Sequence, residues 1–185
     1  MTAGLELFQA AEVPVLLRPF VRRALFVCVE DAIDTVIQPR PTGYQYLIWV
    51  VRGELIQEVG GEHRYGSGKV FLPGQIKDHD IAIRYTGKVV MLMLEFTALG
   101  CYQLFGIPGR ATLNQSPTLE SMCTTGGEFQ RKLLAQSVSM DAENISARFD
   151  VLFRNLEDVA STLTSVPDYL VTALHEIEMR DGAIK

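Results

Sequence analysis

Residues 91–114 read MLMLEFTALGCYQLFGIPGRATLN, and this stretch says more about the fold than any other part of the chain. The apolar run at residues 89–94 continues into Glu-Phe at 95–96, and a short amphipathic segment then ends at the Gly-Ile-Pro of residues 106–108. Because the run at 89–94 has no polar face, we expect a strand that is covered on both sides of its sheet.

The part of the chain before Ser121 is punctuated by Gly and Pro and carries short runs of β-branched and aromatic residues, which strands favour. Residues 52–53 and 86–88 are interpreted as turns, and residues 60–61 as a hairpin turn. The expected strands cover residues 46–51, 55–59, 63–65, 69–72, 81–85 and 89–96. Strands at this spacing predict a small antiparallel barrel or jelly roll.

After Ser121 the apolar spacing becomes helical, and helices are expected over residues 128–140, 141–163 and 165–181. The second helix carries an apolar stripe with spacings of mostly three and four residues. This stripe can pack on the barrel or pair with a second copy of the chain, and we predict that it contributes to a dimer interface. The residues of the predicted interface are Ile145, Phe149, Leu152, Phe153 and Leu156.

The order of the elements predicts an α+β protein, with an antiparallel barrel or jelly roll first and helices after it. We expect the barrel at residues 1–120, a helical packing and dimerisation segment at residues 121–164, and a linker helix at residues 165–185. The linker helix should begin at Ser165, because a capping side chain there is followed by Pro167 in the first turn.

The chain has 185 residues, a net charge of −5 and three cysteines without a close pair. The acidic balance argues against direct binding of nucleic acid, which usually requires a basic patch. Cys28, Cys101 and Cys123 fit neither a disulfide framework nor zinc-ligand spacing, so we expect reduced thiols. Because no leader pattern begins the chain and the longest apolar run is too short to span a bilayer, we expect a cytoplasmic protein without membrane contact.

The sequence contains no strong catalytic motif. Its three histidines form no His-x-His pair, and the best cluster of possible metal ligands is Asp78-His79-Asp80. In a strand, the two carboxylates of that cluster would point away from the histidine. The Gly-Ser-Gly-Lys of residues 66–69 lacks the spacing of a phosphate loop and precedes a strand. We therefore expect no metal, no cofactor and no catalytic residue, and a protein that is not an enzyme.

Aromatic and polar side chains gather in the expected strands, where a barrel can enclose a small ligand. The candidate pocket residues are Tyr44, Tyr46, Trp49, Phe71, His79 and Arg84. The alternative is a barrel that its own side chains fill completely. Glu95, at the end of the apolar strand, is either a pocket carboxylate or a member of a structural ion pair.

The order of these motifs resembles the N-terminal sensor domain of AraC-family transcription regulators, in the branch with a degenerate cupin-like barrel. Residues 17–21 resemble the family's opening strand, and residues 41–49 resemble its proline-glycine strand entry. The best match is the stretch at residues 95–114. The helices after Ser121 resemble the family's dimerisation and linker helices, and residues 166–185 resemble the first helix of its DNA-binding half.

The resemblance implies the effector-sensing and dimerisation portion of a bacterial DNA-binding regulator. It implies a homodimer through the C-terminal helices and a small-molecule effector. Because no recognition helix is present, DNA contact is expected only through an absent C-terminal domain, and the chain is either a fragment or a natural truncation. Two rivals remain, a stand-alone cupin-type metalloenzyme and a protein-interaction module without a ligand.

Overall fold

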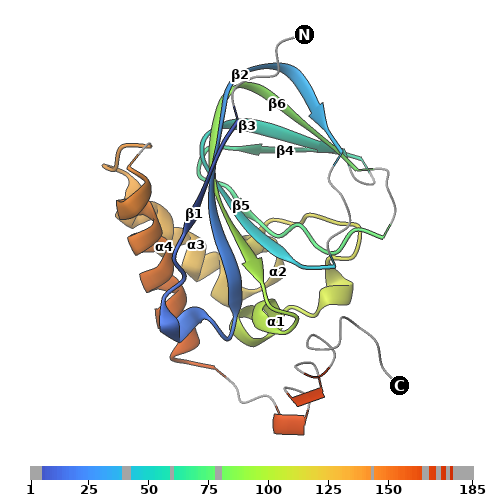
Figure 1. Cartoon of the computed structure of the whole chain (residues 1–185), viewed down its shortest axis with the longest axis vertical. Helices are drawn as coiled ribbons and strands as arrows, with labels where there is room; N and C mark the ends of the chain where they lie inside the picture. Colours follow the sequence, from blue (N-terminus) through green and yellow to red (C-terminus); the bar gives the residue numbers. More distant parts are fainter. Residues whose placement is uncertain are drawn as a thin grey trace.

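The computed structural model describes residues 6–38, 43–58, 61–77, 81–142, 144–163, 167–169, 172–173 and 176. In these residues an antiparallel sheet comes first and the main helices follow (Figure 1), so the expected α+β class is confirmed. The strands are β1 (Glu6–Ala11), β2 (Val21–Ile37), β3 (Tyr46–Glu58), β4 (Glu62–Gly66), β5 (Val70–Phe71) and β6 (Ala82–Phe96). The helices are α1 (Gly100–Phe105), α2 (Leu119–Met122), α3 (Thr124–Ser137) and α4 (Ile145–Ala160), with short 3₁₀ turns at Val15–Leu17 and Gly109–Ala111.

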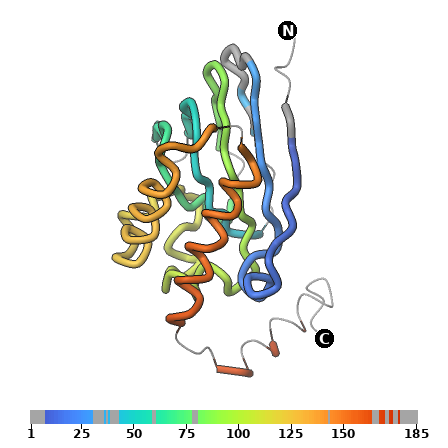
Figure 2. The backbone as a smooth tube through the Cα atoms, turned by 90° about the vertical axis from the view of Figure 1, so that its left-hand side faces the viewer, coloured from blue at the N-terminus to red at the C-terminus, as the bar shows by residue number. Residues whose placement is uncertain are grey.

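The strand order of the sheet is β1-β2-β6-β3-β4, and β5 pairs with β3 beside this path. Strand β6 is therefore central, and it pairs antiparallel with β2 on one side and with β3 on the other. Helices α3 and α4 lie together on one side of the sheet (Figure 2). None of the described helices is long and apolar enough to cross a membrane.

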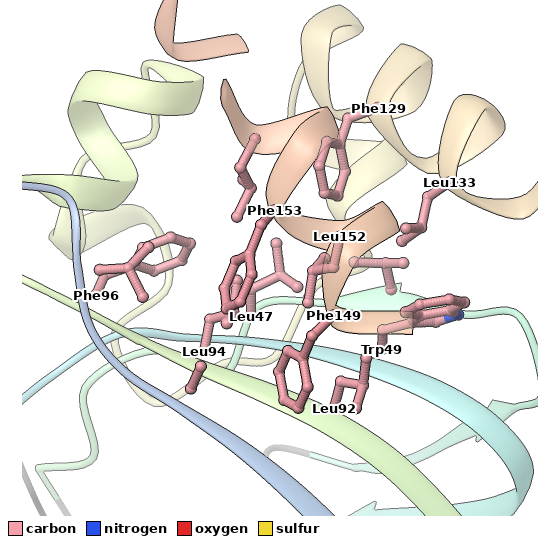
Figure 3. Close-up of a cluster of buried hydrophobic side chains, with 14 of the residues drawn as sticks. Leu47, Trp49, Leu92, Leu94, Phe96, Phe129, Leu133, Phe149, Leu152 and Phe153 are labelled. Atoms are coloured by element: carbon pink, nitrogen blue, oxygen red, sulfur yellow. The ribbon is translucent and has the colours of Figure 1, made fainter. Parts of the chain in front are cut away.

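Strand β6 divides its side chains between two apolar cores, one on each face of the sheet. Val90, Leu92 and Leu94 join the helix-side core, whose other members include Phe149 and Phe153 of α4 (Figure 3). The alternate residues Val89 and Met91 join a second core on the opposite face, which we call the inner core. The expectation that this apolar strand is covered on both sides is confirmed.

The turns expected at residues 52–53 and 86–88 are wrong, because β3 and β6 run straight through both segments. The register between these two strands shifts around Arg52, and Gly53 has a φ of +82°. A residue at positive φ inside a paired strand makes a bulge that bends the strand without reversing it. Gly53 must be glycine, since a Cβ there would lie 2.4 Å from the carbonyl oxygen of Lys88.

The structure also shifts the predicted helix ends. Helix α3 begins at Thr124, four residues before the expected start at 128, because the Cys123 sulfur accepts a hydrogen bond from the backbone N–H of Gly126. Helix α4 begins at Ile145, where the Asn144 side chain accepts a hydrogen bond from the N–H of Ala147 at 3.2 Å. A capping side chain fixes the residue at which a helix begins, whereas apolar spacing locates that residue only to within a few positions.

Two further differences lie near the ends of the chain. Residues 17–21 were expected as an opening strand, but Leu17 ends a 3₁₀ helix, residues 18–20 form a turn, and β2 begins only at Val21. Strand β1 was not predicted from the sequence, and neither was the part of β2 that follows Val21. These two strands pair with each other. Most of the expected linker helix at residues 165–185 lies outside the described residues, although Asp168 and Tyr169 are helical.

Candidate ligand cavity

A cavity of about 390 Å³ opens among the side chains of the inner core, on the face of the sheet opposite α3 and α4. Its walls come from β2, β3, β5, β6 and the segment that follows β5. The lining residues are Arg23, Leu25, Tyr46, Ile48, Leu55, Gln57, Phe71, Pro73, Gly74, Ile76, Ile83, Tyr85, Met91, Met93 and Glu95. A volume near the small end of the range for ligand sites, with a mainly apolar wall, fits a small organic molecule.

The bulge in β3 decides which of its residues face the cavity. Before the bulge the lining residues are the even-numbered Tyr46 and Ile48, and after it they are the odd-numbered Leu55 and Gln57. A shift of one residue exchanges the two faces of a strand, so the bulge at Gly53 brings Gln57 to the cavity.

The segment after β5 closes one side of the cavity and is fixed by backbone contacts. The N–H of Gly74 donates a hydrogen bond to the carbonyl of Gln115 at 3.0 Å, and the N–H of Tyr46 donates to the carbonyl of Pro73 at 2.8 Å. A Cβ at Gly74 would lie 1.8 Å from the carbonyl oxygen of Thr112, so only glycine fits there. This wall is thus held in place by both the sheet and residues 112–115.

Glu95 is both a cavity residue and the centre of an ion pair, which unites the two alternatives left open by the sequence. Its side chain is 8% exposed, and its Oε1 accepts a hydrogen bond from Arg22 Nη1 at 2.8 Å. Arg23 Nε lies 3.8 Å from the same oxygen, and the Tyr46 hydroxyl donates to Oε2 at 3.2 Å. These partners compensate the charge of the buried carboxylate.

Gln57 is the polar group of the cavity whose hydrogen bonding is incomplete. The residue is 3% exposed, and among the described residues no group donates a hydrogen bond to its Oε1. Buried amide oxygens in folded proteins nearly always have a partner, so an unpaired one in a cavity wall is a candidate contact for a ligand atom or a water molecule. The sequence analysis did not single out Gln57.

Of the six candidate pocket residues, Tyr46 and Phe71 line the cavity. Tyr44 lies under the guanidinium of Arg22, 4.3 Å from the centroid of the tyrosine ring. Trp49 belongs to the helix-side core instead, since it alternates with Ile48 on β3.

The other two candidates lie elsewhere. Arg84 forms an ion pair with Glu58 and lies 3.7 Å from a carboxylate oxygen of Glu62, outside the cavity wall. His79 lies outside the residues that the structure describes. The missed lining residues of β6, Ile83, Met91 and Met93, share the odd-numbered face with Tyr85 and Glu95, and this alternation was the available signal.

Most of the apolar stripe of α4 that was predicted as a dimer interface is buried against other residues of the same chain. Phe149, Leu152, Phe153 and Leu156 are buried in the helix-side core, and Ile145 packs at its edge (Figure 3). The packing alternative therefore accounts for these side chains, while association of two copies stays a prediction.

The cavity carries groups suited to binding. Among the described residues, no group of three or more His, Cys, Asp and Glu side chains is arranged to hold a metal ion. The single carboxylate of the described wall, Glu95, is already engaged by Arg22 and Tyr46. Cys101 lies in the helix-side core, where burial raises the pKa of its thiol to about 12, so the reactive thiolate is strongly disfavoured.

No protein-family model matches the chain, and no curated protein matches it. Solved structures that resemble it include a cupin superfamily protein from Desulfitobacterium hafniense, with a TM-score of 0.40 and 15% identity over 52% of this chain and 81% of that one. The cupin domain of an XRE-family transcriptional regulator from Enterobacter cloacae has a TM-score of 0.37 and 11% identity, over 49% of this chain and 94% of that one. Ectoine synthase from P. lautus has a TM-score of 0.38 and 12% identity, over 52% and 66%. Similarity this low, over about half of the chain, assigns no function.

Proposed function

We propose that this chain is the effector-sensing portion of an AraC-type transcription regulator and binds a small organic molecule in the cavity of its sheet. The observation that carries the proposal is the cavity of about 390 Å³, in which the Oε1 of Gln57 has no hydrogen-bond partner among the described residues. The order of motifs at residues 95–114 supports the regulator family.

Neighbouring residues of β3 face the cavity and the helix-side core in turn, so this strand connects the cavity to the helices. Ile48 lines the cavity, and its neighbour Trp49 packs in the helix-side core against Arg148 of α4. A ligand that binds one arrangement of these strands better than another would shift the population of α4 positions. In the proposed regulator, this shift changes how the DNA-binding halves are placed.

The proposal assigns a binding role and no catalysis to the cavity. It includes a homodimer formed through the outer surface of α3, α4 and their connection, because the inward stripe of α4 is already buried. Val138, 85% exposed just after α3, is the apolar side chain best placed for such a contact. If Val138→Glu leaves the sedimentation coefficient of a dimeric wild type unchanged, this part of the proposal is wrong.

A thermal-denaturation screen against a collection of metabolites tests the sensing function. A ligand of the folded state must raise the unfolding temperature by mass action. The variant Met93→Trp fills the cavity and should abolish the shift, whereas Val36→Trp, at a position 54% exposed, should keep it. If every compound that stabilises the wild type stabilises Met93→Trp equally, the cavity is not the binding site and the proposal is wrong.

A further inference from the structure

We infer that the cavity selects a mainly apolar, uncharged ligand that donates one hydrogen bond, from a hydroxyl or an N–H group, to Oε1 of Gln57. This inference rests on the proposed sensing function and specifies the chemical class of its ligand. It follows from three properties of the cavity: its wall, its unpaired acceptor and the state of its charged groups.

The wall of the cavity favours an apolar body. Leu25, Ile48 and Phe71 come from three different strands, and Met91 and Met93 contribute flexible thioether side chains from β6. Methionine adapts to irregular shapes and makes favourable contacts with aromatic rings. A ring system or a branched hydrocarbon makes no hydrogen bonds with water. Its transfer from water to this apolar wall is therefore favourable.

The unpaired acceptor sets the polar part of the ligand. Gln57 is 3% exposed, so bulk water does not reach its amide freely, and its Oε1 lacks a donor within the described part of the chain. A site that must bond a donor discriminates strongly against an analogue without one, because the buried acceptor is then left unpaired. A carboxylate facing Oε1 would bring two acceptor oxygens together and be repelled, unless the amide made a half-turn and presented its Nε2 donor.

The charged groups argue for an uncharged ligand. Glu95 already accepts hydrogen bonds from Arg22 and Tyr46, so it attracts a cationic ligand only weakly. The remaining cation of the described wall, Arg23, has a side chain 60% exposed and lies 3.8 Å from Glu95 Oε1. An anionic ligand would compete with Glu95 for Arg23 and with water for its exposed guanidinium. An anion therefore meets only a solvent-exposed cation, where the attraction is screened, and a cation meets a carboxylate that is already paired.

Three matched probes test the inference: 2-naphthol, 2-methoxynaphthalene and 2-naphthoate. The three probes share one ring system. The hydroxyl of 2-naphthol donates a hydrogen bond, the ether oxygen of 2-methoxynaphthalene only accepts one, and 2-naphthoate carries a negatively charged carboxylate. Isothermal titration at neutral pH should give the tightest binding for 2-naphthol, roughly tenfold tighter than for 2-methoxynaphthalene, as expected for one hydrogen bond in a buried site. Binding of 2-naphthoate should be the weakest.

Variants assign the effect to the glutamine. Gln57→Leu should remove the preference for 2-naphthol over 2-methoxynaphthalene, while Gln9→Leu, at an exposed position of β1, should keep it. Far-ultraviolet circular dichroism checks that each variant is folded.

The possible failures separate the two claims. If the probes bind, Met93→Trp blocks them, and Gln57→Leu does not affect 2-naphthol, the inference is wrong and the sensing function stands. A preference of the wild type for 2-methoxynaphthalene or 2-naphthoate overturns the inference in the same way. If none of the probes binds and the metabolite screen also finds no ligand, both claims fall.

Discussion

The guanidinium of Arg148 lies over the indole ring of Trp49, 5.3 Å from its centroid, and joins helix α4 to the sheet. The same guanidinium donates hydrogen bonds to the carbonyls of Asp141 at 2.9 Å and Met140 at 2.8 Å. Burial lowers the pKa of Arg148, and the carbonyls and the ring compensate part of this unfavourable environment. One side chain therefore fixes α4, the connection before it and β3 relative to one another.

Replacing this arginine should destabilise the fold. Arg148→Met should lower the free energy of unfolding by about 2–4 kcal/mol, because two carbonyls each lose one donor and the indole loses its cation. Urea denaturation followed by the fluorescence of Trp49, the single tryptophan of the chain, measures the change. The matched control Arg154→Met, at an exposed position of α4, should stay within about 0.5 kcal/mol of the wild type. Equal effects of the two variants would contradict this role of Arg148.

The bulge glycine in β3 should tolerate no side chain. Gly53→Ala combines a φ of +82° with a Cβ only 2.4 Å from the Lys88 carbonyl oxygen. We expect a loss of about 3 kcal/mol or more, part of it from the left-handed backbone and the rest from this clash. Gly87→Ala is the control, since φ there is +70° but no atom of the described residues lies within 4 Å of the added Cβ. Its loss should be limited to about 1–2 kcal/mol, and thermal denaturation of the two variants should rank them in this order.

Arg22 should matter to stability far more than a surface arginine. Arg22→Ala leaves Glu95, whose side chain is 8% exposed, with only Tyr46 and the longer contact to Arg23. We expect a loss of about 1–3 kcal/mol in unfolding free energy, reduced from the fully buried case because Arg22 is itself 40% exposed. Arg64→Ala, which breaks exposed pairs with Glu54 and Glu62, should change stability little. A loss for Arg64→Ala as large as that for Arg22→Ala would refute this difference.

Stability should fall at alkaline pH because of buried groups that resist ionisation. Burial raises the pKa of Cys101 from 9.0 to about 12 and that of Tyr65 from 10.0 to about 12. Each group stays neutral in the folded protein where the unfolded chain would release its proton. The stabilisation is therefore complete below pH 9 and is lost as the pH rises from about 9 towards 12, by up to about 1.4 kcal/mol per pH unit for each group.

Variants separate the two contributions to this alkaline slope. Cys101→Ala should flatten the fall between pH 9 and 10, and Tyr65→Phe should flatten it above pH 10. Chemical denaturation at a series of pH values gives the slope for each protein. If Cys101→Ala retains the full slope from pH 9, the buried thiol is not its source.

Strands β3 and β6 were predicted in part because their sequences are rich in apolar and β-branched residues, whereas β1 and the long β2 were not predicted. The ends of β3 and β6 could not be predicted, because glycine marks turns and bulges alike. Gly53 and Gly87 were interpreted as turn residues, and both lie within long paired strands. What distinguishes the two cases is whether the chain after the glycine continues to pair with the same neighbour, and local sequence does not contain that information.

The site was predicted only in part, for a related reason. Both faces of β3 carry apolar or aromatic residues, so the sequence does not show which face holds the cavity. Trp49 was expected in the pocket together with Tyr46, although the two differ by an odd number of positions and face opposite sides. The bulge shifts by one residue the alternation of side chains between the two faces of β3, and Gln57 faces the cavity only because of this shift. Glu95 was recognisable because a carboxylate that ends a wholly apolar strand requires a partner.

The alternation along β6 has a consequence for how such a protein can diverge during evolution. Met91 and Met93 meet the cavity, while Leu92 and Leu94, their immediate neighbours, meet the helices. Under the proposed sensing function, mutations that change which compound binds therefore fall on different codons from those that would disturb the packing of α4. The proposed sensor can then change its ligand through substitutions at Met91 or Met93 and keep the packing of α4 unchanged.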